Sequence, residues 1–173
     1  MGRKDQNENR TLLILDLDET LIHATKHQLA REPDFKLGPY FVYIRPYLSS
    51  FLQEVSKDFL LAVWSSASDD YIEATAQQII SPLVELTFIW GRSRCTYRRN
   101  FTLDERRIIS DDLSDHYYFA KPLKKVRRQG YHLDRVLIVD DTPEKIHHNY
   151  GNAIYPRLYQ GQAHDDEYLS PFS

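Results

Sequence analysis

The chain has one cysteine, one methionine and no long apolar run. The single Cys95 excludes an intrachain disulfide and fits a reducing compartment. No apolar stretch approaches the roughly 18 residues that a membrane span needs. The polar residues 1–10 also lack the apolar segment of a signal peptide. We therefore expect a protein of the cytoplasm, or of the nucleus if the source is a eukaryote, with no membrane partner.

A dominant charge of either sign is also missing. Lys and Arg number 22 against 25 Asp and Glu, which gives a net charge of −3. This balance argues against bulk binding to nucleic acid. With 42% apolar residues in 173 positions, the chain has enough apolar surface for a core. We expect a flexible N-terminus over residues 1–10, a single domain over residues 11–173, and a monomer.

The most informative feature that is present is an acid pair behind an apolar run. Residues 12–15 are all apolar, and Asp16, Asp18 and Thr20 follow them. A short apolar run of this kind is typical of a buried strand in a parallel sheet. Side chains at i and i+2 of an extended segment point the same way, so two carboxylates would lie together where α/β sheets bind ligands. Such a pair repels itself unless one acid is protonated or both face a cation.

Other segments of the chain complete a pattern. Residues 136–139 form a second apolar run, which ends in Asp140 and Asp141. Residues 59–64 form a third, which ends in the hydroxyls Ser65 and Ser66. Lys121 stands between the hydroxyls and the second acid pair. The carboxyl ends of parallel strands share one edge, so we expect these groups to meet there.

An acid pair, a hydroxyl, a lysine and another acid pair, in this order, resemble the haloacid dehalogenase (HAD) superfamily. Within it, DLDETL at residues 16–21 and VDDTP at residues 139–143 look like the FCP/SCP-like small C-terminal-domain phosphatases, also called NLI-interacting-factor-like proteins. The resemblance runs from about Thr11 to about Tyr159. It implies an α/β fold, a Rossmannoid three-layer sandwich with a central parallel sheet, a small β insertion at about residues 91–120 and no large cap.

The resemblance also implies roles for four catalytic residues. Asp16 would be the nucleophile that forms an aspartyl-phosphate, and Asp18 the general acid and base. Ser65, where the family more often has Thr, would donate to a phosphate oxygen. Lys121 would hold the phosphate and the charge of the nucleophile, with Lys124 and Lys125 as rival candidates.

Mg²⁺ is the cofactor that the resemblance implies, since this hard ion prefers oxygen ligands. The implied ligands are the side chains of Asp16 and Asp141 and the backbone carbonyl of Asp18. Asp140 would be a nearby or water-mediated partner. The family often has Asn where Asp141 stands, and the extra charge would alter metal or phosphate binding.

Composition and periodicity predict the remaining elements. Residues 22–39 are polar and contain breakers, which indicates a loop beside the site. The family resemblance implies that residues His164 to Leu169 begin a final helix. The other predicted strands cover residues 40–44, 86–90 and 153–155, and the predicted helices cover about residues 46–55, 68–80, 122–129 and 143–149.

The insertion is too small to close over the site, and an open cleft suits a phosphate on a macromolecule. Four arginines fall between Arg92 and Arg99, and guanidinium groups pair well with phosphate. We expect Arg94 and Arg98 to bind substrate together with Thr20 and Ser66. A charged hairpin edge that is simply solvated would look the same.

These features favour a Mg²⁺-dependent phosphatase that acts on phosphoserine or phosphothreonine in a protein. A first alternative keeps the chemistry but takes a phosphate at a nucleic-acid end, which the arginines favour and the net charge does not. A second alternative is a catalytically decayed binding module, against which the complete set of acids, hydroxyl and lysine argues.

Overall fold

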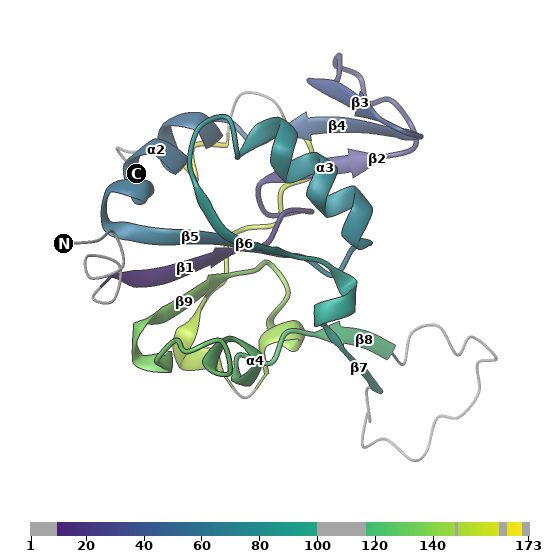
Figure 1. Cartoon of the computed structure of the whole chain (residues 1–173). Helices are drawn as coiled ribbons and strands as arrows, with labels where there is room; N and C mark the ends of the chain where they lie inside the picture. The colour runs from purple at the N-terminus through teal and green to yellow at the C-terminus, as the bar shows by residue number, and fades with distance from the viewer. Residues whose placement is uncertain (1–9, 100–116, 148, 163–165, 171–173) are drawn as a thin grey trace.

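A computed structural model describes residues 10–99, 117–147, 149–162 and 166–170 of the chain (Figure 1). The predicted flexible N-terminus lies almost wholly outside the described residues. The middle of the insertion, residues 100–116, and the start of the predicted final helix, residues 163–165, lie outside them too.

A parallel five-stranded sheet forms the centre of the molecule, with strand order β10-β9-β1-β5-β6. The predicted α/β fold with a central parallel sheet is thereby confirmed. Leu12, Ile14 and Ala62 are fully buried because both faces of the sheet are covered. The strands are β1 (Thr11–Leu15), β5 (Phe59–Trp64), β6 (Leu86–Trp90), β9 (Val136–Val139) and β10 (Ala153–Ile154).

Helices lie on both sides of this sheet and complete three layers (Figure 1). Helices α2 (Leu48–Asp58) and α3 (Asp69–Ile79) pack on one face, and α4 (Lys124–Arg127) lies on the other. Helix α4 is a single turn, shorter than predicted, because Gly130 follows at a positive φ of 99°. The predicted helix after Pro143 is the 3₁₀ turn η4 (Pro143–Ile146).

Two small antiparallel sheets flank the central one. The prediction of a loop over residues 22–39 is wrong, because β2 (Ile22–Thr25) and β3 (Phe35–Leu37) both pair with β4 (Tyr40–Ile44). These two strands are short and only partly buried, so they lack the continuous apolar run of an interior strand. The predicted small β insertion is present as the 3₁₀ turn η1 (Arg92–Arg94) and the hairpin of β7 (Thr96–Arg99) and β8 (Tyr117–Ala120).

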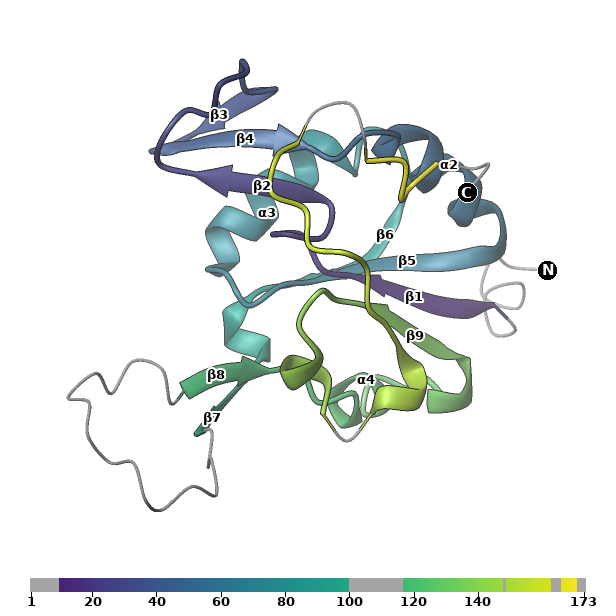
Figure 2. The same cartoon turned by 180° about the vertical axis from the view of Figure 1, so that it is seen from behind.

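After β10 the chain runs back across the sheet, past β1 and β2, toward α2 (Figure 2). Its described end, residues 166–170, forms a turn instead of a helix, and Leu169 is buried in the core. Tyr159 anchors this segment, since its backbone N–H donates to Glu19 and its hydroxyl donates to the carbonyl of Ile44. In the described residues, no helix is both long and apolar enough for a membrane crossing.

Candidate active site

Two acids stand side by side at the carboxyl edge of the sheet. Asp16 follows β1 and Asp140 follows β9, and the pairing of Leu15 with Val139 brings the two strand ends together. The N–H of Asp16 donates to the carbonyl of Val139 at 2.9 Å, which fixes the backbone at this point. Both carboxylates are buried, with 1% and 0% of their residues' surface exposed. Two buried like charges need a cation between them.

Lys121 supplies that cation. Its Nζ donates to Asp16 Oδ1 at 2.7 Å and to Asp140 Oδ2 at 2.5 Å, and the residue is fully buried. Burial alone disfavours a charged ammonium, but the charges of Asp16 and Asp140 outweigh it and raise the pKa of Lys121. Of the three candidate lysines, the structure places Lys121 here, whereas Lys125 Nζ donates to the carbonyls of Arg94 and Cys95.

A divalent metal fits beside this lysine. One carboxylate oxygen from each of Asp16, Asp140 and Asp141 lies within 4.8 Å of the other two. Asp16 Oδ2 is buried and accepts no hydrogen bond, so it needs a cationic partner. Lys145 Nζ lies 3.8 Å from it, too far for a hydrogen bond. The all-oxygen donor set matches the preference of Mg²⁺.

Hydroxyl groups hold Asp141 in this cluster. Thr20 Oγ1 donates to Asp141 Oδ1 at 3.5 Å, and Thr142 Oγ1 donates to Oδ2 at 3.2 Å. Thr20 is 1% exposed. The structure thus brings Thr20 against a candidate metal ligand, and its predicted contact with substrate stays a prediction.

Asp18 has different surroundings from Asp16. Its side chain lies outside the group of three metal-ligand candidates, and the predicted metal contact through its backbone carbonyl stays a prediction. Tyr71 of α3 donates to Asp18 Oδ1 at 2.8 Å, and Ser65 Oγ donates to Oδ2 at 3.4 Å. Burial, together with the charge of Asp16, raises the pKa of Asp18 to about 6, while the hydrogen bond from Tyr71 opposes the rise. A carboxyl group with this pKa can both give and take a proton near neutral pH.

Burial, followed by the charge of Asp16, also raises the pKa of Asp140 to about 6, and Lys121 acts against this rise. The Asp140 carboxylate is fixed from a second side, because the N–H of Thr142 donates to its Oδ1 at 2.9 Å. Asp140 is thus oriented toward Lys121.

The hydroxyl loop after β5 lies next to Asp18. Ser65 is buried, and its N–H donates to the carbonyl of Trp90, which extends the pairing of β5 with β6. Ser66 follows and is partly buried, and its carbonyl accepts a hydrogen bond from Arg92 Nε at 2.8 Å. The guanidinium of Arg92 also lies 4.9 Å from the ring centroid of Phe119. Arg92 therefore ties the insertion to the hydroxyl loop.

The two arginines predicted to bind substrate are both exposed, and neither has a hydrogen bond or ion pair with the carboxylates among the described residues. Arg94 lies over the ring of Trp90, 4.8 Å from its centroid. Arg98 stands on β7, opposite Tyr118. Their predicted contact with substrate is untested by this arrangement.

Three residues of the site were not predicted from the sequence: Tyr71, Lys145 and Arg92. Tyr71 lies on the third position of α3 and reaches back to the strand edge, a direction that only the placement of the helix reveals. Lys145 lies in η4, a few residues after Asp140 and Asp141. Its closeness to this acid pair is the one feature of the sequence that could have indicated a place in the site. Arg92 is two residues before Arg94, which was predicted to bind substrate.

A parallel sheet with a lysine-bridged acid cluster at its carboxyl edge defines an α/β protein of the HAD type. The chain belongs to the family of NLI interacting factor-like phosphatases, which it matches over residues 11–173. This confirms the family resemblance that the two acid motifs indicate.

Characterised relatives carry related names. The chain is 31% identical over 163 residues to CTD nuclear envelope phosphatase 1B of Danio rerio, and the match covers 86% of this chain and 58% of that protein. It is 25% identical to carboxy-terminal domain RNA polymerase II polypeptide A small phosphatase 1 of Homo sapiens, over 98% of this chain and 60% of that protein. The chain thus spans a little over half the length of these relatives.

A solved structure shows the same fold. The fission yeast RNA polymerase II CTD phosphatase Fcp1, in a variant bound to beryllium fluoride, superposes with a TM-score of 0.60 at 20% identity. The match covers 91% of this chain and 44% of that one. It supports the three-layer architecture described above.

Proposed function

We propose that this chain is a Mg²⁺-dependent phosphatase that hydrolyses phosphomonoesters through an aspartyl-phosphate on Asp16. The observation that carries the proposal is the buried Asp16 itself, which accepts a hydrogen bond from Lys121 on one oxygen and none on the other. A buried carboxylate oxygen that accepts no hydrogen bond is costly, and a bound metal or a substrate phosphorus would use it.

The first half of the reaction transfers the phosphoryl group to the protein. A carboxylate oxygen of Asp16 attacks phosphorus, and the bond from phosphorus to the ester oxygen breaks. Asp18 gives its proton to the departing oxygen, and the pKa of about 6 lets it hold that proton. Lys121 and the Ser65 hydroxyl lie where they would bind phosphate oxygens. A Mg²⁺ held by Asp16, Asp141 and the Asp18 carbonyl would offset the negative charge of the phosphate.

The second half returns Asp16 to its starting state. Asp18, now deprotonated, takes a proton from water while the water oxygen attacks phosphorus. The bond between phosphorus and Asp16 breaks, and inorganic phosphate leaves. Tyr71 keeps the Asp18 carboxylate in place throughout both halves.

The test compares hydrolysis of para-nitrophenyl phosphate by the wild type and by Asp16→Asn. We expect metal-dependent turnover that EDTA abolishes and added Mg²⁺ restores. The variant should lose at least about a thousandfold in kcat, since no other group can form the covalent intermediate. Asp134→Asn is the matched control, because Asp134 lies before β9, at the opposite end of the strand from Asp140. Turnover retained by a folded Asp16→Asn protein would overturn the proposal.

The substrate class that we propose is a phosphorylated protein, with phosphoserine or phosphothreonine as the reacting group. The named relatives are CTD phosphatases, and the described part of the insertion is a short hairpin. The complete acid, lysine and hydroxyl set argues against a decayed binding module. The cellular location expected from the sequence stays a prediction, and the name of the Danio rerio relative points to the nuclear envelope as a further candidate.

A further inference from the structure

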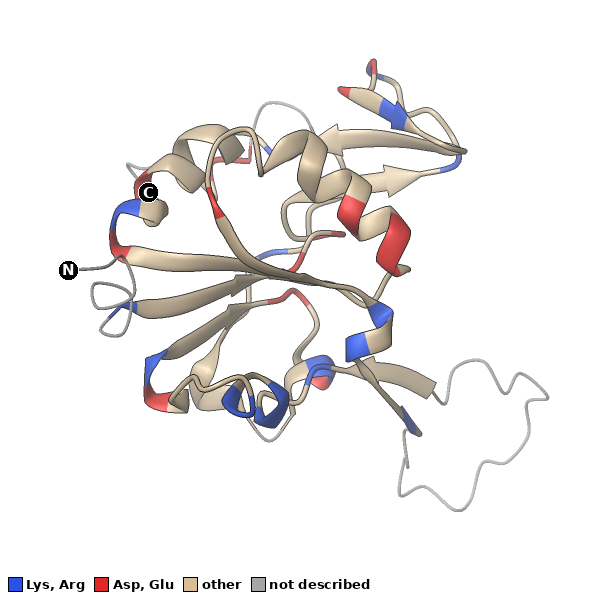
Figure 3. Ribbon diagram, viewed as in Figure 1, with Lys and Arg blue, Asp and Glu red and all other residues tan. Residues whose placement is uncertain are grey.

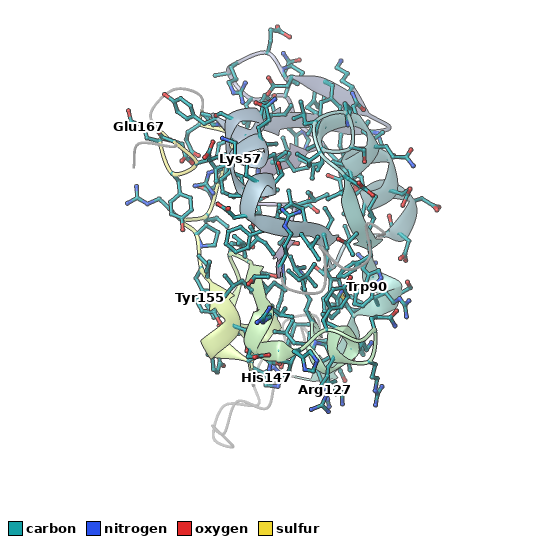
Figure 4. All side chains as sticks on the ribbon, turned by 60° about the vertical axis from the view of Figure 1, so that its left-hand side comes forward. Lys57, Trp90, Arg127, His147, Tyr155 and Glu167 are labelled. Atoms are coloured by element: carbon teal, nitrogen blue, oxygen red, sulfur yellow. The ribbon has the colours of Figure 1, made fainter. Side chains whose placement is uncertain are left out.

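Five cations lie on η1, on α4 and on the residue that follows α4, and we call this set the basic band. It consists of Arg94, Lys124, Lys125, Arg127 and Arg128. All but the partly buried Lys125 are exposed, because Leu123 and Val126 are the residues of this turn that face the core. Figure 3 shows the basic ribbon of α4 and η1, and Figure 4 shows Arg127 projecting at the lower edge of the molecule. A band of one sign is notable on a chain with a net charge of −3.

Hydrogen bonds join the two parts of the basic band. Lys125 Nζ donates to the carbonyl of Arg94 at 2.8 Å and to that of Cys95 at 3.0 Å. Burial, with the repulsion of Arg94, Lys124 and Arg128, lowers the pKa of Lys125, so these cations lie close enough to repel one another. Among the described residues, none of the five pairs with a carboxylate. Unpaired neighbouring cations favour an anionic partner.

The basic band begins at the candidate active site. Cys95 Sγ lies 3.6 Å from the carbonyl of Ser65, so the start of the band packs directly behind the hydroxyl loop. At its other end, α4 starts three residues after Lys121. Both attachment points are thus next to groups that would bind the phosphate.

We propose that the basic band binds acidic residues that flank the phosphorylated residue of a protein substrate. This inference rests on the proposed function and names the substrate class of the same site. A phosphate bound at Asp16 would lie beside Ser65 and Lys121, the groups next to which the band is attached, and the residues that flank the phosphate would then face the band. Glutamate, aspartate or a second phosphorylated residue would supply the charge that the band lacks.

A nucleic acid is the other polyanion to consider, and the structure favours the peptide. The net charge of −3 repels an extended polyanion such as a nucleic acid. The few acidic side chains of a peptide substrate would act only close to the site, where they would meet the band. The exposed aromatic rings of the β7–β8 hairpin are already in use, since Tyr97 and Tyr117 stack on each other with a centroid distance of 4.9 Å. A base would have to replace this contact in order to stack.

The test uses phosphoserine peptides that differ only in their flanks. One set carries three glutamates on the amino side or on the carboxyl side of the phosphoserine, and the reference peptide has glutamine at all six positions. The readout is the ratio of kcat/KM for each acidic peptide to kcat/KM for the glutamine peptide. We expect a ratio of about five or more on at least one side at low salt, falling toward one as salt rises, since exposed ion pairs are individually weak and screened.

Charge reversal assigns the preference to the band. Lys124→Glu with Arg128→Glu should bring the ratio to about one or below by repulsion, and Lys124→Gln with Arg128→Gln should bring it to about one with less risk to folding. The control is Lys57→Glu on α2, because Lys57 is also exposed but lies across the sheet from α4 (Figures 1 and 4). It should keep the ratio of the wild type.

Failure of this inference is separable from failure of the proposed function. Fluorescence anisotropy of the labelled peptides on Asp16→Asn measures binding without turnover, so the flank preference can be read even from an inactive protein. A ratio near one in the wild type, or a ratio unchanged by both double variants, overturns the role of the band. The inference is also overturned, in favour of nucleic acid, if two results occur together. The protein removes a terminal phosphate from an oligonucleotide faster than it dephosphorylates the best acidic peptide, and the double variants lose this oligonucleotide activity.

Discussion

At the scale of single residues, two aspartates that are two positions apart have different environments. Asp16 lies against the Lys121 ammonium, and Asp18 lies against the hydroxyls of Tyr71 and Ser65. A cation favours the charged carboxylate, whereas burial favours the protonated one. These different neighbours suit the roles that we propose, with Asp16 as the nucleophile and Asp18 as the proton donor.

Tyr71→Phe tests whether the phenol holds Asp18 in place. The variant keeps the ring and removes the donor at 2.8 Å, so the carboxyl group is free to turn. We expect kcat for para-nitrophenyl phosphate to fall about tenfold, the value of roughly one hydrogen bond to a charged group. KM should change much less, because Tyr71 does not touch the phosphate-binding groups.

Tyr40→Phe is the control for this prediction. The ring of Tyr40 packs edge-on against Tyr71, with centroids 5.7 Å apart, yet its hydroxyl has no hydrogen bond among the described residues. Loss of this hydroxyl should leave kcat near the wild-type value. Equal losses in both variants would show that packing, and not the hydrogen bond to Asp18, matters at this position.

Residues that follow a strand end were predictable, and residues that reach the site from elsewhere were not. Asp16, Ser65 and Asp140 each come directly after an apolar run, so the sequence alone places them at one sheet edge. Tyr71 reaches Asp18 from a helix whose rotation depends on packing. Asp141 and Thr20 were both predicted, but the contact between them depends on the curvature of two loops.

At the scale of elements, the junction of α3 and η1 connects the insertion to the sheet. Ser93 donates to the carboxylate of Asp69 through its N–H at 3.2 Å and its hydroxyl at 2.7 Å. Gly91 lies so close to this junction that a Cβ there would stand 2.7 Å from the Cα of Asp69. Only a residue without a side chain fits at this position.

Gly91→Ala should destabilise the protein by about 1–3 kcal/mol, because backbone atoms must move apart to admit the methyl group. Urea denaturation followed by tryptophan fluorescence measures the loss, and Trp90 is adjacent in sequence. Gly151→Ala is the control, since a Cβ at Gly151 meets nothing within 4 Å. If the two variants unfold at the same urea concentration, the close approach of Gly91 to Asp69 is not a constraint in solution.

Interior elements were more predictable than peripheral ones. The interior strands β1, β5 and β9 match the predicted runs closely, because a strand buried on both faces must be apolar throughout. The edge strand β6 also matches its predicted range. The strands β2 and β3 were not predicted, because their composition does not indicate strands. Their extended conformation depends on pairing with β4. Helix α4 was predicted too long, because its basic residues suit a helix interior while Gly130 ends it early.

At the scale of the whole molecule, Arg45 joins three distant parts of the chain. Its side chain is fully buried at the end of β4 and donates to the carbonyls of Thr20 and Arg157. It also pairs with Asp166 at 2.8 Å. One guanidinium thus holds together the loop after β1, the end of β4 and the segment after β10.

Asp166→Ala should lower the free energy of unfolding by about 3 kcal/mol, because it leaves the buried guanidinium without its counter-charge. The matched control is Glu54→Ala, which breaks the exposed pair with Lys57 and should cost less than about 1 kcal/mol. Thermal and urea unfolding of both variants measure the difference. A loss at Asp166 no larger than that at Glu54 would mean that water replaces the carboxylate at no cost.

The lone thiol of Cys95 gives this molecule a native reporter of its own motion. The sulfur is buried between the hydroxyl loop and η1, and burial raises its pKa, so an aromatic disulfide reagent should react with it only when the packing around it opens locally. No other cysteine competes for the reagent. The labelling rate of the unaltered chain therefore measures local opening beside the hydroxyl loop, and a slower rate on addition of a phosphate analogue would register ligand binding without an attached dye.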